Sequence, residues 1–315
     1  MSEKSQGRLA LVTGGAGFIG GHLVEGLLAA DWSVRVIDDF STGSEQNLAS
    51  VIDRIELTRG DIRDADVLKR VMNGVEVVFH QAAMASVPRS IAMPILTNSI
   101  NTDGTLLVLE SARQFGVRRV VFAASSSAYG ETEVLPKVET LPAIPLSPYA
   151  LQKYTGEVYC RLYSELYGLE TVALRYFNIF GPRQDPNSDY AAVVPLFVTA
   201  ALAGRPPVIY GDGEQTRDFT YVENAVQANL LAADADRASG LVINIAAGIR
   251  TSLNELWRNI RKIVDTDVEP RYADPREGDV RDSVADLARA AEFLGYDPGV
   301  ALDEGLARTI DSFRL

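Results

Sequence analysis

A glycine-rich turn near the N-terminus is the feature that most constrains the fold. Residues 13–20 read Thr-Gly-Gly-Ala-Gly-Phe-Ile-Gly, between an apolar run suited to a buried strand and a helical pattern. The turn contains three regularly placed glycines: Gly14, Gly17 and Gly20. Because glycine has no Cβ, the backbone can turn sharply there and bring the helix N-terminus close to an anion. Such a strand–turn–helix unit predicts a site for the pyrophosphate of a dinucleotide.

An acidic residue ends the next predicted strand, over residues 34–38. Asp38 lies about 20 residues beyond the glycine turn, where a carboxylate accepts hydrogen bonds from the ribose hydroxyls of a bound dinucleotide. Asp38 and Asp39 would also repel a 2′-phosphate. The sequence therefore predicts NAD rather than NADP as the cofactor.

The rest of the chain alternates strands and helices up to about residue 178. Further strands are predicted at residues 55–58, 75–80, 120–124 and 171–175, and helices at residues 64–72, 102–115 and 148–167. This alternation predicts the α/β class, with a Rossmann-type doubly wound parallel sheet and a smaller, mostly C-terminal substrate lobe. We expect the NAD-binding domain at residues 1–178 with a return segment at 217–247. The substrate lobe is expected at residues 179–216 and 248–315.

A serine, a tyrosine and a lysine form the predicted reaction site. Ser125 follows an apolar strand, at the edge of an open sheet where ligands bind. Tyr149 and Lys153 are four residues apart on a predicted helix and so share one face. Ionising a phenol at neutral pH requires about 4 kcal/mol, which a positive charge about 4 Å away supplies at an effective dielectric near 20. Tyr149 is thus predicted as a general base, with Lys153 and oxidised nicotinamide as the charges that lower its pKa.

Composition limits the partners and the compartment. With 42 acidic and 30 basic residues, the net charge of −12 argues against nucleic acid and anionic membranes as partners, and requires a local arginine site for an anionic substrate. The single cysteine, Cys160, excludes an intrachain disulfide, and no signal peptide is recognised at the N-terminus, so a cytoplasmic location is expected. The chain has two histidines, His22 and His80, and no His/Cys metal site is expected.

These motifs resemble the extended short-chain dehydrogenase/reductase superfamily, and most closely its sugar-nucleotide 4-epimerase branch. Within that branch the chain is more similar to UDP-N-acetylglucosamine 4-epimerases than to UDP-galactose ones. The resemblance implies that Ser125, rather than Ser126 or Ser127, is the catalytic serine. It also implies a homodimer formed through two helices, including the one that carries Tyr149.

The resemblance further implies two sets of binding residues. The predicted cofactor-binding residues, besides Tyr149 and Lys153, are Gly14, Gly17, Phe18, Ile19, Gly20, Asp38, Asp39, Asp61, Ile62, Gln81, Ala82, Ala83, Asn101 and Phe177. The predicted substrate-binding residues are Ser125, Asn178, Val193, Tyr210, Arg217, Arg276, Asp279 and Ser283. Ordinary structural roles are open for Asp61 as a turn cap and for Phe177 and Val193 as core residues. The resemblance implies that the segments containing Arg217 and Arg276 bind the diphosphate and the nucleoside, and guanidinium groups suit phosphate oxygens.

Small departures within the family narrow the expected reaction. Related 4,6-dehydratases carry an acidic residue one or two places after the catalytic serine, whereas this chain has Ser126 and Ser127. The residue beside the sugar C2 substituent is Ser283, which leaves room for an N-acetyl group where a large aromatic residue would not. The resemblance thus implies NAD-dependent C4 epimerisation of UDP-N-acetylglucosamine, and of UDP-glucose, through a 4-keto sugar. A dehydratase, decarboxylase or reductase on the same scaffold stays open, as does a non-catalytic NAD-binding protein.

Overall fold

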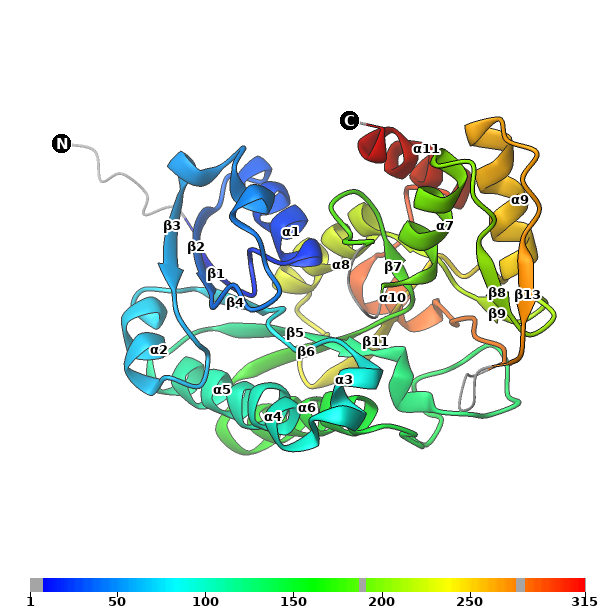
Figure 1. The fold of residues 1–315 in the computed structure, drawn as a ribbon. Coiled ribbons are helices and arrows are strands. Elements are labelled where there is room, and N and C mark those ends of the chain that lie inside the picture. The colour runs from blue at the N-terminus through cyan, green and yellow to red at the C-terminus, as the bar shows by residue number, and fades with distance from the viewer. Residues whose placement is uncertain (1–7, 187–190, 276–280, 315) are drawn as a thin grey trace.

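Within residues 8–186, 191–275 and 281–314, which the computed structural model describes, a seven-stranded parallel sheet forms the centre (Figure 1). Its strand order is β11-β6-β5-β4-β1-β2-β3, and every neighbouring pair is parallel. The strands are β1 (Leu9–Thr13), β2 (Ser33–Asp38), β3 (Ile55–Arg59), β4 (Val77–His80), β5 (Arg119–Ser125), β6 (Glu170–Tyr176) and β11 (Leu241–Ile245). The predicted doubly wound α/β fold is confirmed.

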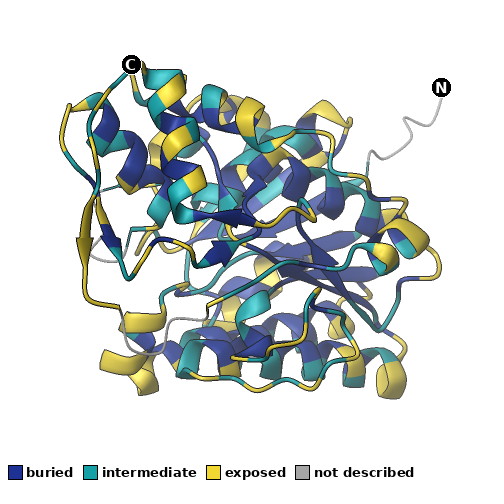
Figure 2. Ribbon diagram, turned by 90° about the vertical axis from the view of Figure 1, so that its right-hand side faces the viewer, coloured by how far each residue is buried: buried dark blue, intermediate teal, exposed yellow. Residues whose placement is uncertain are grey.

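Helices cover both faces of this sheet, as Figure 1 shows. On one face lie α1 (Phe18–Ala29), α8 (Val222–Asp234) and α10 (Ala288–Leu294). On the other lie α2 (Ala65–Met72), α5 (Gly104–Gln114) and α6 (Pro148–Tyr167), with the short α3 (Val87–Ala92) and α4 (Pro94–Asn98) beside them. Figure 2 shows the sheet buried between these layers, with the exposed residues on their outer surfaces.

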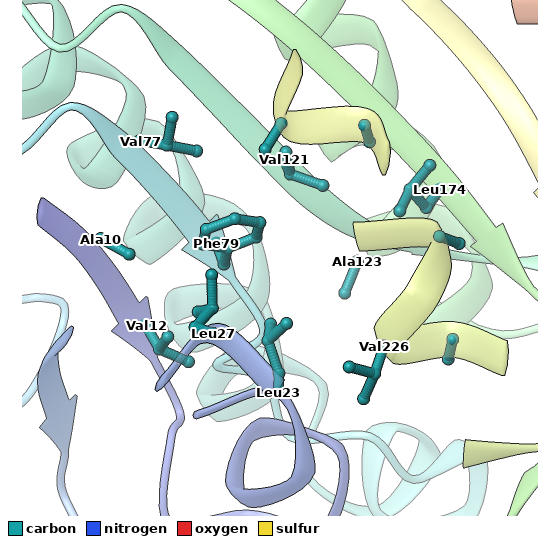
Figure 3. Packing of buried hydrophobic residues seen from close by; sticks show 14 of the residues in the cluster. Ala10, Val12, Leu23, Leu27, Val77, Phe79, Val121, Ala123, Leu174 and Val226 are labelled. Atoms are coloured by element: carbon teal, nitrogen blue, oxygen red, sulfur yellow. The ribbon is translucent and has the colours of Figure 1, made fainter. Parts of the chain in front are cut away.

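The core on the first face forms because α1 and α8 present apolar residues at helical spacing. Leu23 and Leu27 are one turn apart on α1 and point to the sheet, where Phe79 of β4 lies (Figure 3). Val226 of α8 extends the same cluster toward β5 and β6. All but Val226 of these four side chains are fully buried. This packing fixes α1, and with it the glycine turn, against the ends of β1 and β4.

Local signals set the limits of α6, the helix that carries two of the predicted catalytic residues. The hydroxyl of Ser147 accepts a hydrogen bond from the amide of Ala150, and Pro148 occupies the first turn, where a missing N–H is tolerated. Gly168 ends the helix with a positive φ of 71°. The resulting helix, Pro148–Tyr167, has the bounds predicted from the sequence.

A second cluster of elements lies beyond the carboxyl ends of the strands. Its helices are α7 (Val193–Leu202), α9 (Leu253–Val264) and α11 (Leu302–Phe313). Its short strand pairs are β7 (Ile179–Phe180) with β10 (Thr220–Tyr221), β9 (Thr216–Arg217) with β12 (Thr251–Ser252), and β8 (Val208–Tyr210) with β13 (Arg271–Ala273). They share a core in which the rings of Phe197 and Trp257 meet edge to face, 5.7 Å apart. Across the described part of the chain, no helix is both long enough and apolar enough to span a bilayer.

Candidate active site

Two neighbouring cavities lie at the carboxyl edge of the sheet, where parallel folds bind ligands. The larger cavity, of about 810 Å³, reaches from the glycine turn to the second cluster of elements. The smaller cavity, of about 90 Å³, lies at the ends of β2 and β3. Both cavities have Gly14, Gly17 and Gln81 in their walls. The two cavities therefore adjoin each other at the glycine turn and Gln81.

The glycine turn has the close packing that the sequence predicted. Gly14 has a φ of +69°, and a Cβ there would lie 2.7 Å from the backbone of Ala82. A Cβ on Gly20 would lie 2.0 Å from the carbonyl oxygen of Gly14. The N-terminus of α1 has no side-chain cap, since its N-cap residue is Gly17. The first amides of α1 are thus left to a ligand, and the turn fits a pyrophosphate.

The predicted adenosine end is acidic. Asp38, Asp39, Asp61, Ile62 and Ala82 line the smaller cavity. Asp38 is buried and accepts hydrogen bonds from the amides of Ala16 (2.9 Å) and Phe40 (2.8 Å). Burial raises the pKa of this carboxyl, and the two amides oppose the rise. Asp38 therefore lies against the glycine turn, as a ribose ligand of NAD would.

The predicted catalytic residues meet in the larger cavity. Ser125 is the last residue of β5, Tyr149 is in the first turn of α6, and Lys153 lies one turn further along it. The hydroxyl of Ser125 accepts hydrogen bonds from the amide (3.2 Å) and the hydroxyl (2.8 Å) of Ser127. The Lys153 ammonium is buried and donates to the carbonyl oxygen of Ala123, 2.7 Å away. Strand β5 and helix α6 thus fix all three side chains on one wall.

Burial shifts the pKa values of two of these side chains in the absence of NAD. Burial raises the pKa of the Tyr149 phenol, and a hydrogen bond with Ser125 opposes the rise. The Lys153 ammonium donates its hydrogen bond to the Ala123 carbonyl rather than to the phenol. Burial also lowers the pKa of Lys153 to about 8. The predicted lowering of the tyrosine pKa by Lys153 and oxidised nicotinamide together concerns the site with NAD bound, and it stays a prediction.

The other predicted cofactor residues divide into two groups. Phe18, Ile19, Gly20 and Ala83 line the larger cavity. Asn101 lies behind the wall, where it pairs with the backbone of Met84 and donates to Gln152. Phe177 is fully buried and packs against the Tyr129 ring. Asp61 also forms an ion pair with Arg63 and accepts from its amide, so the turn-cap role applies.

The predicted substrate residues divide in the same way. Asn178, Arg217 and Ser283 line the larger cavity together with Ser125. Val193 begins α7 and packs on the core of the second cluster, and Tyr210 ends β8; neither is among the residues lining the cavity. Arg276 and Asp279 lie outside the described residues. The role of each of these residues in substrate binding stays a prediction.

Some residues of the site carry no signal in a single sequence. Lys137 and Gln184 line the larger cavity without belonging to a predicted motif. Asp218 is fully buried and accepts from the amides of Ala247 (2.9 Å), Gly248 (3.1 Å) and Ala285 (3.1 Å), which ties three segments together. Burial raises its pKa to about 6. Its position directly after Arg217, a predicted substrate ligand, was the one available sign.

The two histidines have structural surroundings. His80 is fully buried between the hydroxyls of Thr13 (2.7 Å) and Thr105 (2.9 Å), and burial lowers its pKa to about 3. His22 pairs with Arg183 and the carbonyl of Pro182. Among the described residues, no group of three or more His, Cys, Asp or Glu side chains could hold a metal ion.

A Rossmann-type sheet whose glycine turn shares one cavity with a Ser-Tyr-Lys set defines a nucleotide-dependent enzyme of the extended short-chain dehydrogenase/reductase type. The comparisons make this more specific. The model of the NAD-dependent epimerase/dehydratase family matches residues 10–246, and the chain belongs to that family. The predicted family and its cofactor, NAD, are thereby confirmed.

The chain is similar in sequence to enzymes that catalyse more than one type of reaction. The chain is 43% identical to the UDP-glucose 4-epimerase of Mycolicibacterium smegmatis, over 96% of this chain and 98% of that protein. It is 34% identical to a UDP-N-acetyl-α-D-glucosaminuronate decarboxylase of Bacillus cytotoxicus, over 96% and 97%. The family thus indicates a sugar-nucleotide enzyme, with epimerisation the best-supported reaction.

Solved structures agree with this grouping. The UDP-N-acetylglucosamine 4-epimerase of Methanobrevibacter ruminantium M1, in complex with UDP-N-acetylmuramic acid, is 41% identical with a TM-score of 0.94 over 98% of both chains. The UDP-glucose 4-epimerase of Thermus thermophilus, in complex with NAD, is 37% identical, with a TM-score of 0.88 over 97% of this chain and 99% of that one.

Proposed function

We propose that this protein is an NAD-dependent 4-epimerase of UDP-hexoses. It interconverts UDP-N-acetylglucosamine with UDP-N-acetylgalactosamine, and UDP-glucose with UDP-galactose, through a 4-keto sugar. The observation that carries the proposal is that Ser125, Tyr149 and Lys153 line the same cavity as the glycine turn. The similarity to 4-epimerases at about 40% identity supports this reaction over others.

The residues of the chain transfer one proton, that of the sugar C4 hydroxyl, and position the oxygen that loses it. Tyr149 accepts the proton of the sugar C4 hydroxyl, while Ser125 hydrogen-bonds the same oxygen and keeps it in line. Lys153 keeps a positive charge at neutral pH, since its pKa is about 8, and is held in place by the Ala123 carbonyl. NAD, held at the glycine turn and Asp38, would supply the hydride acceptor for C4 and the hydride donor for the reverse transfer.

The proposed reaction requires the sugar to turn while the nucleotide stays in place. Epimerisation needs the 4-keto sugar to rotate about its phosphate linkage while the nucleotide stays bound. Arg217 lines the cavity on the side of the second cluster, where it is our proposed ligand of the diphosphate. In this proposal the sugar rotates between its two orientations within the larger cavity, of about 810 Å³.

The residues next to Ser125 and at position 283 support the choice of substrate and reaction. Ser126 and Ser127 both line the cavity, so neither position supplies the carboxyl that a dehydratase uses to remove water. Ser283 also lines the cavity, and its small side chain leaves space for an acetamido group. We therefore propose that N-acetylated sugars are preferred and plain hexoses are also converted.

Product analysis tests this proposal. Purified protein is incubated separately with UDP-N-acetylglucosamine and UDP-glucose, and the products and rates are followed by NMR. The C4 diastereomer of each sugar is expected, with the higher kcat/KM for the acetamido sugar. A dehydrated or decarboxylated product, formed in place of the C4 epimer, would reassign the reaction.

We also propose a cytoplasmic homodimer that forms through α6 and a neighbouring helix. Exposed apolar side chains on these helices support this assembly: Ile95 of α4 is 86% exposed and Leu166 of α6 is 66% exposed. A mass determined in solution at twice that of the chain would support the dimer, and a monomer mass would exclude it.

A further inference from the structure

A single arginine joins three segments that surround the glycine turn. Arg183 lies in the segment 181–186 directly after β7, here called the β7 segment, and its side chain is 23% exposed. Its guanidinium forms two hydrogen bonds with the carboxylate of Glu25 on α1, at 2.7 and 3.1 Å. It also donates to the carbonyl oxygen of Asn47 (2.9 Å) and to Nδ1 of His22 (2.7 Å). The β7 segment is thereby tied to α1 and to residues 39–48 after β2, here called the β2 segment.

The β2 segment forms part of the wall of the smaller cavity. Ser41 and Thr42 of this segment line the cavity. The side-chain amide of Asn47 donates to the carbonyl oxygen of Ala16, in the glycine turn, 2.8 Å away. Asn47 therefore holds the segment against the turn with its side chain, while its backbone carbonyl accepts from Arg183.

The β7 segment forms part of the wall of the larger cavity. Gln184 lines this cavity, and its side-chain amide donates to the carbonyl oxygen of Ile179, 3.3 Å away. The preceding residue, Arg183, has a φ of +68°, a backbone conformation that residues with a Cβ adopt rarely. Such a conformation persists where the surrounding contacts maintain it. The contacts of the Arg183 guanidinium thus help to fix the backbone that carries Gln184.

The position of Gly21 shows how closely these groups lie to α1. Gly21 directly follows Gly20 and is not one of the three glycines of the turn. A Cβ on Gly21 would lie 3.1 Å from the carbonyl oxygen of Asn47 and 3.6 Å from Nη1 of Arg183. The arginine and the β2 segment therefore pack directly on α1, one residue beyond the turn. Among the described residues, those that line the two cavities do not include Arg183, so it acts through its neighbours.

We propose that Arg183 is a positioning residue for NAD, and that it slows the release of the cofactor. By joining the β2 and β7 segments across α1, it keeps both cavity walls in place against the glycine turn. Movement of either wall would open the way out for a bound dinucleotide, and the contacts of Arg183 oppose this movement. The inference goes beyond the proposed function, since it concerns the time that NAD stays bound and not the sugar that is converted.

The rate of NAD release tests this inference directly. Wild type and Arg183→Met are saturated with NAD and transferred by gel filtration to buffer without nucleotide. The NAD that remains bound is then measured over time, after denaturation of samples. We expect Arg183→Met to release NAD at least tenfold faster than the wild type. With saturating NAD in the assay, its kcat for UDP-N-acetylglucosamine should stay within threefold of the wild type.

An arginine of α9 provides the matched control. Arg261 has the same exposed fraction as Arg183, 23%, and its ion pair with Glu269 has the same distance as that of Arg183 with Glu25, 2.7 Å. Its partners, Glu269 and the carbonyl of Thr266, lie in the segment after α9, which contributes no residue to the described walls of either cavity. Arg261→Met should therefore release NAD at the wild-type rate. Circular dichroism and the Tm of each variant show whether the fold is intact.

A change in the partner of Arg183 gives a second, independent readout. Glu25→Gln removes the charge of the ion pair and leaves the contacts of Arg183 with Asn47 and His22. This variant should release NAD faster than the wild type and more slowly than Arg183→Met. Equal release rates in the wild type and folded Arg183→Met overturn the inference, as does release from Arg261→Met that is as fast as from Arg183→Met. If Arg183→Met does not fold, the release rate of Glu25→Gln decides in its place, and a rate equal to that of the wild type overturns the inference.

Discussion

The buried ion pair behind the catalytic lysine makes a quantitative prediction possible. Glu157, one turn after Lys153 on α6, forms two hydrogen bonds with Arg175 of β6, at 2.8 and 2.6 Å. The two side chains are 2% and 4% exposed. One donor of the guanidinium, Nη1, already has no hydrogen-bond partner in the described structure. Replacing Glu157 by Gln leaves a buried charge uncompensated, which destabilises a protein by about 3–5 kcal/mol.

A second pair on the same helix provides the matched control. Arg161 and Glu165 lie 3.4 Å apart and are each 54% exposed. Because exposed pairs contribute about 0–1 kcal/mol, Glu165→Gln should change stability by less than about 1 kcal/mol. Urea unfolding of the wild type and both variants, at saturating NAD, measures the difference. The double variant Glu157→Leu/Arg175→Met, which removes both charges, should be more stable than Glu157→Gln alone.

The same variant should also change the pH dependence of catalysis. Burial lowers the pKa of Lys153, and the neighbouring Cys160 and Glu157 oppose this. Without the Glu157 carboxylate the pKa of Lys153 falls below about 8, and the alkaline limb of kcat/KM moves to lower pH. If Glu157→Gln and Glu165→Gln unfold at the same urea concentration, with equal m values and unchanged pH profiles, the reasoning on the buried pair is refuted.

Three further predictions concern the turn, a buried histidine and the sugar pocket. Gly20→Ala should lose bound NAD, because the added Cβ would lie 2.0 Å from the Gly14 carbonyl oxygen. Bound NAD is measured as the nucleotide released from the denatured protein. The control Gly299→Ala, whose Cβ would have open space around it, should retain NAD. Because burial lowers the pKa of His80 from 6.5 to about 3, the unfolded chain binds a proton below pH 6.5 that the native state does not. This contribution to stability is present above pH 6.5 and is reduced by about 2 kcal/mol at pH 5. In urea unfolding, the loss of unfolding free energy between pH 8 and pH 5 should therefore be smaller in His80→Gln than in the wild type. An equal loss in the two proteins would contradict the prediction. Ser283→Tyr should lower kcat/KM for UDP-N-acetylglucosamine at least tenfold and that for UDP-glucose less than threefold, and equal effects would remove Ser283 as the size determinant.

The elements that the sequence predicts well are those with local causes. The glycine turn follows from the spacing of residues without a Cβ, and the limits of α6 follow from Ser147, Pro148 and Gly168. The parallel sheet follows from repeated strand–helix units. The catalytic set was found because its three residues lie at fixed points of this pattern: a strand end and one helix face.

What the sequence could not predict depends on contacts between distant segments. Lys137 enters the cavity wall because its backbone pairs with Val284 and Asp286, far along the chain. Asn101 is engaged by Met84 and Gln152, so its side chain holds a loop and a helix together behind the wall. A π-helical turn at Ser99–Asp103 also delays the start of α5, which was expected two residues earlier. The direction of the Lys153 ammonium toward Ala123 likewise depends on how α6 packs on β5.

The most direct test of the account is the effect of Tyr149→Phe on UDP-N-acetylglucosamine epimerisation. Tyr154→Phe, on the same helix and outside the walls of the described cavities, is the matched control. The rate of C4 epimer formation is measured by NMR, and retained NAD is measured in the same samples. We predict that Tyr149→Phe keeps its NAD and loses at least about 100-fold in kcat, while Tyr154→Phe stays close to the wild type. Epimerisation at the wild-type rate by Tyr149→Phe would contradict the assignment of this phenol as the base.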